Sequence, residues 1–350
     1  MNRIISYSAS LLAVAALAGC AVEPSESSGV SAKAYFDAWM QINHPEAEPT
    51  ELGTYVIEDE EGSGALVGDE EQSPYLLVRY IVSGLDGNIS NTSEESVAQQ
   101  LGTYDPSYFY GPRVWARVDG NTLYAGVEDA VSTMRVGGRR KTVIPGWLMT
   151  TSRYDSPQDY IDNVSGSNSI YDITVEGVVE DIEKWELDAL AAYVQSHFSK
   201  EKDDTLKYGL YYVQHKKPGP DDDDTVAFAT DSTVYINYIG RRLDGQVFDT
   251  NIRDTAKRYD IFSSSAEYEP VAVTWNKDDY TELKMGASSG SSGSSMIDGF
   301  AYALWKMRGH EAGTCIFYSG LGYGSSGSGS RIPEYSPLQF YIEIVDKEED

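Results

Sequence analysis

The sequence predicts an α+β protein built from two copies of one domain. Segments 233–239 and 338–345 alternate apolar and polar residues, as half-buried β-strands do. Segment 297–307 places apolar residues three to four positions apart, which predicts an amphipathic helix. Antiparallel strands packed on one helix form an α+β arrangement, and an internal repeat predicts that the arrangement occurs twice.

The repeat is visible when the two halves of the chain are compared. Four segments of the first half echo four of the second in the same order: 52–56 with 208–212, 78–87 with 236–245, 124–134 with 297–307, and 169–175 with 338–344. A duplication is the simplest account of this shared order.

A predicted helix precedes each copy. Residues 31–43 place Tyr35, Trp39 and Ile42 on one face, and Ser31 is a suitable N-cap. The second such helix is 182–198, whose apolar residues are Trp185, Leu187, Leu190, Ala191 and Val194.

The second copy also contains an insertion at 268–295. Its end, 286–295, is almost entirely Ser and Gly, and this composition predicts a flexible loop.

The first residues have the pattern of an export signal. An apolar run at 11–17 is too short to span a membrane and fits a signal peptide at 1–19. Residues 17–20 (LAGC) resemble a bacterial lipobox, which implies that Cys20 is lipidated. An ordinary signal peptide is the alternative. We expect a lipoprotein tethered by 20–30 to a membrane, the outer one, and facing the periplasm or the cell surface.

Composition and charge narrow the range of functions. The net charge of −28 disfavours nucleic acid as a partner. Cys315 lies in a strand-like apolar run and is expected to be a small buried side chain. The four histidines lack metal-ligand spacing, and the aspartates at 221–224 lack the pattern of a calcium loop, so they predict a solvated loop. The sequence predicts no metal and no cofactor.

Three stretches of the second copy resemble one enzyme family. They read VYINYIGRRLDGQVFDTN at 234–251, MIDGF at 296–300 and GYGSSGSGSRIP at 322–333. Their order and spacing resemble the FKBP-type peptidyl-prolyl cis-trans isomerases, or rotamases. The resemblance implies two FKBP-like domains, each a curved antiparallel β-sheet packed on a short α-helix, with an additional helix before each. Phe300 stands where the family usually has Trp, and Glu334 replaces a second proline.

The resemblance implies a reaction that needs neither a nucleophile nor a metal. Rotation about an X-Pro bond is slow because its partial double bond sets a barrier of about 18–20 kcal/mol. A dry aromatic pocket lowers that barrier if it binds the twisted amide better than the planar forms.

The same resemblance assigns roles to residues of the pocket. Tyr238 and Phe248 would form one wall, Phe300 the floor and Phe340 the back, although each aromatic residue taken alone is more often core. The catalytic residues would be Tyr238, Phe248, Asp249, Ile297, Phe300, Tyr323 and Phe340, and the substrate-binding residues Met296 and Ile332.

The polar groups would fix the peptide. The Ile297 N–H would bind a substrate carbonyl, and the Tyr323 hydroxyl would reach the peptide backbone. Asp249 would orient Tyr238 or polarise the substrate.

The first copy keeps the scaffold and is expected to lose the pocket. Tyr80 corresponds to Tyr238 and Tyr171 to Phe340, but Ser90-Asn91 replaces the Phe-Asp pair and Val127 stands at the floor. We therefore expect a degenerate domain at 31–181, a helical connector at 182–202 and an isomerase domain at 203–350. The first copy would be structural or would bind clients.

Three functions are consistent with these patterns. The favoured one is an isomerase that assists the folding of exported, proline-containing polypeptides. The alternative is a non-catalytic periplasmic chaperone or interaction lipoprotein that binds polypeptide through both copies. A glycan-binding lipoprotein rests only on the content of Tyr and Trp.

Overall fold

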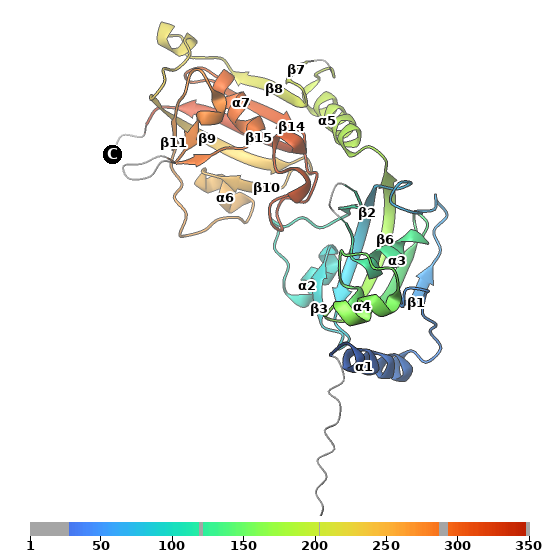
Figure 1. The fold of residues 1–350 in the computed structure, drawn as a ribbon. Coiled ribbons are helices and arrows are strands. Elements are labelled where there is room, and N and C mark those ends of the chain that lie inside the picture. The colour runs from blue at the N-terminus through green and yellow to red at the C-terminus, as the bar shows by residue number, and fades with distance from the viewer. Residues whose placement is uncertain (1–27, 119–121, 203, 287–292, 348–350) are drawn as a thin grey trace, which may run out of the picture.

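The computed structural model describes residues 28–118, 122–202, 204–286 and 293–347, which form two lobes, each with its own antiparallel sheet (Figure 1). The predicted signal peptide, the lipidation site Cys20 and most of the tether lie outside the described residues. Within those residues, no helix is both long and apolar enough to cross a membrane.

The first lobe is a six-stranded sheet with its helices packed around it. The strands run in the order β1-β5-β6-β2-β3, and β4 also pairs with β2. They are β1 (Tyr55–Glu60), β2 (Tyr75–Ser83), β3 (Ile89–Thr92), β4 (Arg113–Ala116), β5 (Arg139–Ile144) and β6 (Ser169–Val179). The helices are α1 (Ser28–Asn43), α2 (Glu95–Leu101), α3 (Ala125–Ser132) and α4 (Pro157–Asn163).

The second lobe is a nine-stranded sheet in the order β13-β12-β11-β9-β15-β14-β8-β7, with β10 also paired to β9. Its strands are β7 (Thr205–Lys207), β8 (Leu210–Lys216), β9 (Thr233–Arg242), β10 (Val247–Thr250), β11 (Val271–Thr274), β12 (Lys284–Met285), β13 (Ser294–Ser295), β14 (Ala312–Phe317) and β15 (Leu338–Val345). Its helices are α5 (Ile182–Phe198), α6 (Arg253–Arg258) and α7 (Asp298–Lys306).

The two sheets share one strand order. The path β1-β5-β6-β2 of the first corresponds to β8-β14-β15-β9 of the second, and each path ends on a strand that pairs with two further strands. Helices α3 and α7 follow at equivalent points of the chain. The predicted α+β fold with two similar domains is thus confirmed, and the predicted helix 182–198 and strand 338–345 have the bounds of α5 and β15.

The buried face of α1 differs from the predicted one. Tyr35 and Ile42 are 62% and 79% exposed, whereas Phe36 and Met40 are buried in the first core. Phe36 packs edge-on to the Trp147 ring at 5.3 Å between ring centroids. The apolar residues of this helix cover more than one face, so their spacing alone did not identify the face that meets the core.

Helix α5 packs on the second sheet, although its sequence suggested a separate connector. Leu190 and Val194 are buried in a small cluster with Tyr211 of β8 and Ile316 of β14. The buried Glu186 carboxylate accepts hydrogen bonds from the Ser319 backbone N–H and hydroxyl at 2.8 and 2.7 Å. Because β6 ends at Val179 and α5 begins at Ile182, very little chain separates the lobes.

Part of the insertion is ordered into the sheet. β11 pairs with β9, and β12 pairs with β13, so the predicted flexible loop is corrected at Ser294–Ser295. Residues 287–292 of that loop lie outside the description. Val273, Trp275 and Leu283 of the insertion are fully buried in the second core.

The sequence predicted that the aspartate run at 221–224 is a solvated loop, but the run is not wholly solvated. Asp224 Oδ2 lies 3.0 Å from His310 Nδ1, and Asp346 Oδ1 lies 3.1 Å from the other ring nitrogen. His310 therefore links the segment before β9 to the end of β15. The two carboxylates raise the pKa of His310 above its usual value.

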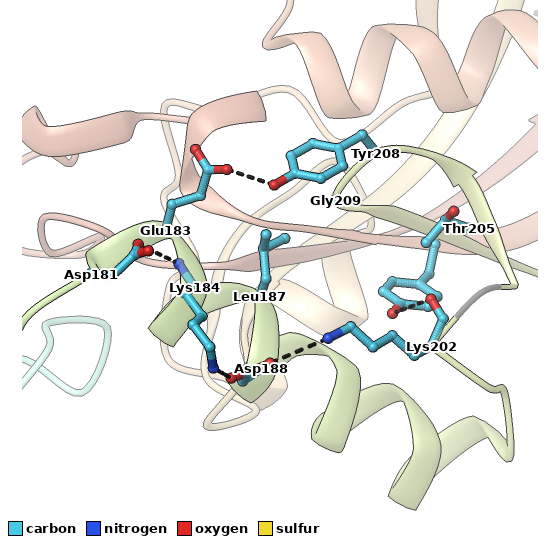
Figure 2. Close-up of a pocket in the computed structure, with 10 residues that line it drawn as sticks. Asp181, Glu183, Lys184, Leu187, Asp188, Lys202, Thr205, Tyr208 and Gly209 are labelled. Atoms are coloured by element: carbon cyan, nitrogen blue, oxygen red, sulfur yellow. Dashed lines mark hydrogen bonds and ion pairs between the residues drawn. The ribbon is translucent and has the colours of Figure 1, made fainter.

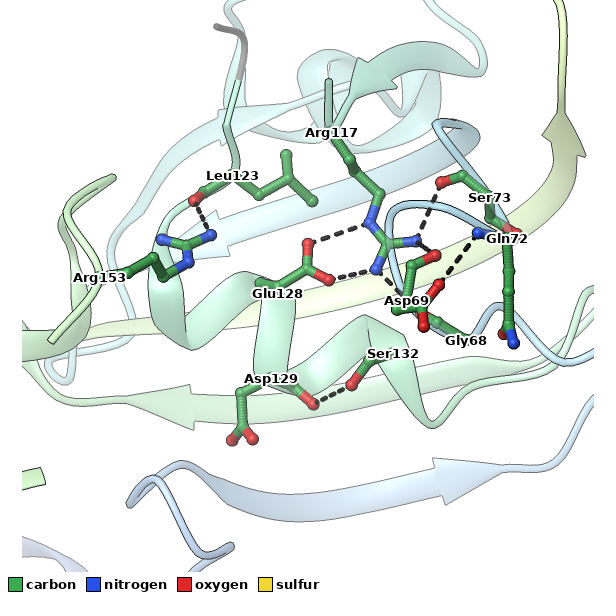
Figure 3. Close-up of polar contacts among 10 residues, drawn as sticks. All are labelled: Gly68, Asp69, Gln72, Ser73, Arg117, Leu123, Glu128, Asp129, Ser132 and Arg153. Carbon is green, nitrogen blue, oxygen red and sulfur yellow. Dashed lines mark hydrogen bonds and ion pairs between the residues drawn. The ribbon is translucent and has the colours of Figure 1, made fainter. Parts of the chain in front are cut away.

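A buried arginine holds the first lobe together (Figure 3). The Arg117 guanidinium donates to Glu128 of α3 and to the main-chain carbonyls of Gly68, Asp69 and Ser73 at 2.9–3.0 Å. Such a charge stays buried only when its donors are satisfied. The network fixes α3 against the loop before β2.

Candidate functional site

An aromatic cluster fills the space between β9, β10, α7 and β15. The rings of Phe300 and Phe340 meet edge to face with centroids 5.0 Å apart, and Phe248 meets Phe340 in the same way at 5.5 Å. Tyr238 contacts Phe300 at 6.0 Å and 82°. Edge-to-face rings pack the positive edge of one ring on the negative face of the next. Four predicted pocket residues from four elements are thus brought together.

A β-bulge sets the direction of two of these side chains. The register between β9 and β10 shifts between Val247 and Asp249, so Phe248 has no single partner across the ladder. Val247 and Phe248 are both buried, and only Asp249 points outward. A regular strand would have placed Phe248 and its neighbour on opposite faces. The bulge therefore places Phe248 in the cluster and Asp249 at its rim.

Tyr238 and Asp249 form the polar pair of the site. The Tyr238 hydroxyl donates to Asp249 Oδ2 at 3.0 Å. Burial, and then the neighbouring carboxylate, raise the pKa of Tyr238, so the phenol stays protonated. The pKa of Asp249 is also raised, chiefly by burial of its surroundings, although the side chain keeps an exposed side; the hydrogen bond from Tyr238 opposes this shift.

Residues after Asp249 anchor the backbone of Tyr238. The Thr250 hydroxyl donates to the Tyr238 carbonyl at 2.6 Å, and the buried Asn251 side chain accepts from the Tyr238 N–H at 2.8 Å. Asn251 Nδ2 also donates to the carbonyls of Ile236 and Glu269 at 3.0 and 2.8 Å. Sequence reasoning did not assign these two residues, although they stand directly after the Phe-Asp pair.

The remaining predicted residues line the rim of the cluster. Met296 and Ile297 are partly buried against it, and Ile332 is 4% exposed within it. Tyr323 is 37% exposed, and its pKa is raised by burial and then by the charge of Asp249. The Ile297 N–H stands at the start of α7 and has no hydrogen-bond partner among the described residues.

Two glycines are required by the close packing of the rings. A Cβ on Gly240 of β9 would lie 2.7 Å from the Phe340 ring and 2.8 Å from the Phe248 ring. A Cβ on Gly299 would lie 2.4 Å from the Phe317 ring, which stacks on Phe340. Both distances are far below van der Waals contact, so α7 and β9 can approach the cluster this closely only because Gly299 and Gly240 have no side chain.

Arg331 is a further residue of the site that the sequence did not reveal. Its Nη1 donates to the Phe248 carbonyl at 3.3 Å, and its positive charge lowers the pKa of the neighbouring Asp249 against the larger effect of burial. Arg331 directly precedes Ile332, so this segment contributes an apolar and a charged group to the same rim.

A separate cavity lies between α5 and the β7–β8 hairpin (Figure 2). Its volume is about 780 Å³. The charged side chains on its wall pair with one another: Lys184 and Lys202 both contact Asp188, and Tyr208 donates to Glu183 at 2.6 Å. These pairs satisfy the groups that a ligand would need, so the aromatic cluster is the better candidate.

The first lobe keeps a cavity at the corresponding place, which corrects the expectation that its pocket is lost. The cavity measures about 340 Å³ and includes Tyr80, Asn91, Val127 and Tyr171 in its lining. Trp115 of β4, which the sequence comparison missed, supplies an aromatic wall 5.4 Å from the Tyr80 ring. Burial raises the pKa of Tyr171 to about 12. Among the described residues, the lining contains no carboxylate equivalent to Asp249.

No group of three or more metal-ligating side chains occurs within the described part of the chain.

Comparison with known proteins assigns the second lobe. Three solved structures are similar to the chain: a peptidyl-prolyl cis-trans isomerase from Pseudomonas syringae pv. tomato, the three FKBP domains of wheat FKBP73, and FkpA from Escherichia coli. Their sequence identities are 20%, 14% and 24%, and their TM-scores are 0.30, 0.27 and 0.30.

The alignments cover 49%, 85% and 47% of this chain and 98%, 95% and 62% of the respective structures. No curated protein matches the chain. Residues 225–345, which contain the whole aromatic cluster, match the family model of FKBP-type peptidyl-prolyl cis-trans isomerases. The match lies within the second lobe, and it is this part of the chain that is similar to the FKBP-type peptidyl-prolyl cis-trans isomerase family.

Proposed function

We propose that the second lobe catalyses cis-trans isomerisation of X-Pro bonds in polypeptides, at the aromatic cluster. One observation carries the proposal: the rings of Phe248, Phe300 and Phe340 and the Ile332 side chain pack beside one polar pair, Tyr238 and Asp249. An apolar cup of this kind accepts a proline ring by shape. The polar pair stands where the backbone that flanks the proline would lie.

The cup lowers the barrier by favouring the twisted amide. Resonance makes the planar X-Pro amide more polar, and water stabilises that polarity. Inside an apolar pocket the planar forms lose this solvation, whereas the twisted form, with less delocalisation, loses less. Phe248, Phe300 and Phe340, all nearly fully buried, supply the apolar surroundings.

Polar groups at the rim hold the peptide during rotation. The Ile297 N–H, which has no partner among the described residues, can donate to one substrate carbonyl, and the Tyr323 hydroxyl can bond a second backbone group. Asp249 keeps the Tyr238 hydroxyl in place through the bond of 3.0 Å. Holding both sides of the X-Pro bond lets the pocket rotate one relative to the other.

We further propose that the clients are exported polypeptides. The support is the sequence at 1–20, which has the pattern of a signal peptide and a lipobox; a chain processed in this way would be anchored through Cys20 outside the cytoplasm. Labelling of the expressed protein with a fatty-acid analogue tests this, because Cys20→Ser must abolish the label.

The isomerase proposal is tested by proline-limited refolding of a client protein with the full chain. Tyr238→Phe and Asp249→Asn preserve shape and are expected to lower kcat/KM by about tenfold. Tyr212→Phe is the matched control, because Tyr212 donates to Glu311 at 2.8 Å in the same lobe, outside the cluster. A folded wild-type chain that leaves the slow phase unchanged contradicts the proposal.

The first-lobe cavity favours a second, non-catalytic function. Its lining of Tyr80, Trp115 and Tyr171 offers apolar contact without the carboxylate, which suits retention of an extended polypeptide. Suppression of client aggregation would then survive Tyr238→Phe and fall in Trp115→Ala. Equal suppression by the two variants would remove this function.

A further inference from the structure

The two lobes meet at the loop that carries the pocket residue Ile332. We call residues 107–113 of the first lobe the bridging segment and residues 327–335 of the second lobe the cover loop. The Phe109 N–H donates to the Ser330 carbonyl at 2.8 Å, which joins the two main chains directly. Arg113 makes a bidentate pair with Glu334 at 2.8–3.0 Å. Figure 1 shows the loops before β15 facing the first lobe.

Arg242 ties the same two segments together from within the junction. It is 4% exposed, and its Nη1 donates to the Arg331 carbonyl at 2.6 Å and to the Ser107 carbonyl at 3.1 Å. Its guanidinium also lies over the Phe109 ring at 5.4 Å. One buried guanidinium therefore binds a carbonyl from each lobe. Such a charge fixes its partners because leaving it unpaired is costly.

An apolar contact supports these polar ones. The ring of Tyr335 in the cover loop meets Tyr75 of β2 edge to face at 5.6 Å. Tyr335 packs with Tyr75, Val114 and Val179, which are buried. Both ends of the segment 330–335 are thus held by the first lobe.

The held segment is also part of the candidate active site. Ile332 is buried in the aromatic cluster, and Arg331 donates to the Phe248 carbonyl at 3.3 Å. The backbone of the rest of the loop has a wide range of accessible conformations, because its residues are mostly Ser and Gly. Gly327 and Gly329 adopt φ of +60° and +56°. Only one bridge, between Ser328 and Ile332, is formed within the loop. Contacts outside the loop therefore set the position of Ile332: those of its side chain with the second core, and those of residues 330–335 with the first lobe.

We propose that the first lobe is a positioning element for the isomerase site, which holds the cover loop in the conformation that substrate binding needs. The inference rests on the proposed function for its kinetic consequence but not for the restraint itself. It assigns the degenerate copy a role that does not depend on any activity of its own.

The restraint predicts a specific kinetic signature. If the loop is released, only a fraction of molecules has Ile332 in place, and apparent affinity falls by that fraction. KM should therefore rise, by about tenfold, while kcat stays near the wild-type value. Loss of folded protein would do the opposite, lowering the apparent kcat at an unchanged KM.

The experiment compares full-length variants by hydrogen exchange and by isomerase kinetics. Arg113→Glu places two carboxylates together, and adding Glu334→Arg restores the pair in reverse. Arg135→Glu is the matched control, because Arg135 pairs with exposed Glu61 and donates to the Gly64 carbonyl, both within the first lobe and outside the bridging segment. We expect faster exchange at the amides of Ser328 and Ile332 in Arg113→Glu alone, with unchanged exchange in β14.

Each outcome decides a separate point. Unchanged exchange in Arg113→Glu overturns the restraint, whatever the activity. Faster exchange with an unchanged KM shows that the loop does not serve binding, which also overturns the proposal. Recovery of both exchange and KM by Glu334→Arg supports it. A wild-type chain with no isomerase activity contradicts the proposed function instead. Hydrogen exchange at Ser328 and Ile332 would then still test whether the first lobe restrains the cover loop.

Discussion

The Tyr238 hydroxyl donates to Asp249 across the β9–β10 hairpin at 3.0 Å, at the rim of the aromatic cluster. The bulge at Phe248 makes this pairing possible, because it turns Asp249 outward while Phe248 remains inside. The pair is thus a product of strand register as much as of sequence. Its ionisation state gives the first prediction.

Isomerase activity should fall on acidification at a higher pH than an ordinary aspartate would cause. The pKa of Asp249 is raised by burial, so the carboxylate takes up its proton earlier as pH decreases. Protonation weakens the acceptor for Tyr238, and kcat/KM decreases. The measurement is a pH–rate profile, in which Asp249→Asn should show no such step.

Removing Arg331 should move that step to still higher pH. Its positive charge favours the ionised form of Asp249 and so lowers the pKa of that carboxyl. Arg331→Gln keeps a hydrogen-bond donor near the Phe248 carbonyl and removes the charge, whereas Arg331→Lys keeps the charge. A midpoint that is the same in both variants contradicts the electrostatic role.

Gly240→Ala should destabilise the second lobe by about 1–3 kcal/mol. The new methyl group would meet the rings of Phe340 and Phe248 at less than 3 Å, and both rings are 5% exposed and pack on each other. Urea unfolding gives the change in the free energy of unfolding. Gly177→Ala is the control, since its nearest contact is the end of the Leu77 side chain at 3.3 Å. Equal losses in both variants would refute the packing argument.

Stability should fall as pH rises through the raised pKa of His310. The Asp224 and Asp346 carboxylates favour the imidazolium, so its contribution is complete below the unfolded-state value of 6.5 and disappears above the folded-state pKa. The melting temperature should therefore decrease on passing through this range, and less so in His310→Gln. Exposure of the ring makes the effect modest. An identical pH dependence in the variant would contradict this assignment.

The Cys315 thiol should be inert in the folded protein. It is completely buried between β8 and β15, and burial raises its pKa to about 12. In a Cys20→Ser background, the rate of reaction with a thiol reagent should equal the rate at which β14 opens. Rapid labelling without denaturant would show that the core of the second lobe is open.

The sequence predicted local elements and the repeat better than it predicted contacts. Helix 182–198 and strand 338–345 were predicted to the residue, because periodicity is a local property. The face of α1 was predicted wrongly, since Tyr35 and Ile42 are as apolar as the buried Phe36. Only the folded chain decides which of them meets the Trp147 ring.

The candidate site shows the same division. The motif series located Tyr238, Asp249 and the rings, which the structure brings together. It did not reveal Arg331 or Trp115, whose roles depend on a loop and a strand that lie far from the motifs or differ between the copies. Their roles follow from tertiary position, which the spacing of residues does not encode.

The shared strand order of the two sheets has a consequence for biogenesis. During synthesis, β2 could pair with β15 instead of β6, or β9 with β6, because equivalent strands have equivalent neighbours. Such exchange would join the lobes into a misassembled chain or link two chains by swapped strands. The divergence of the first copy, with Val82 of β2 opposite Tyr171 where Gly240 of β9 lies opposite Phe340, makes the wrong partner fit poorly. Degeneration of one copy thereby protects the folding of the other.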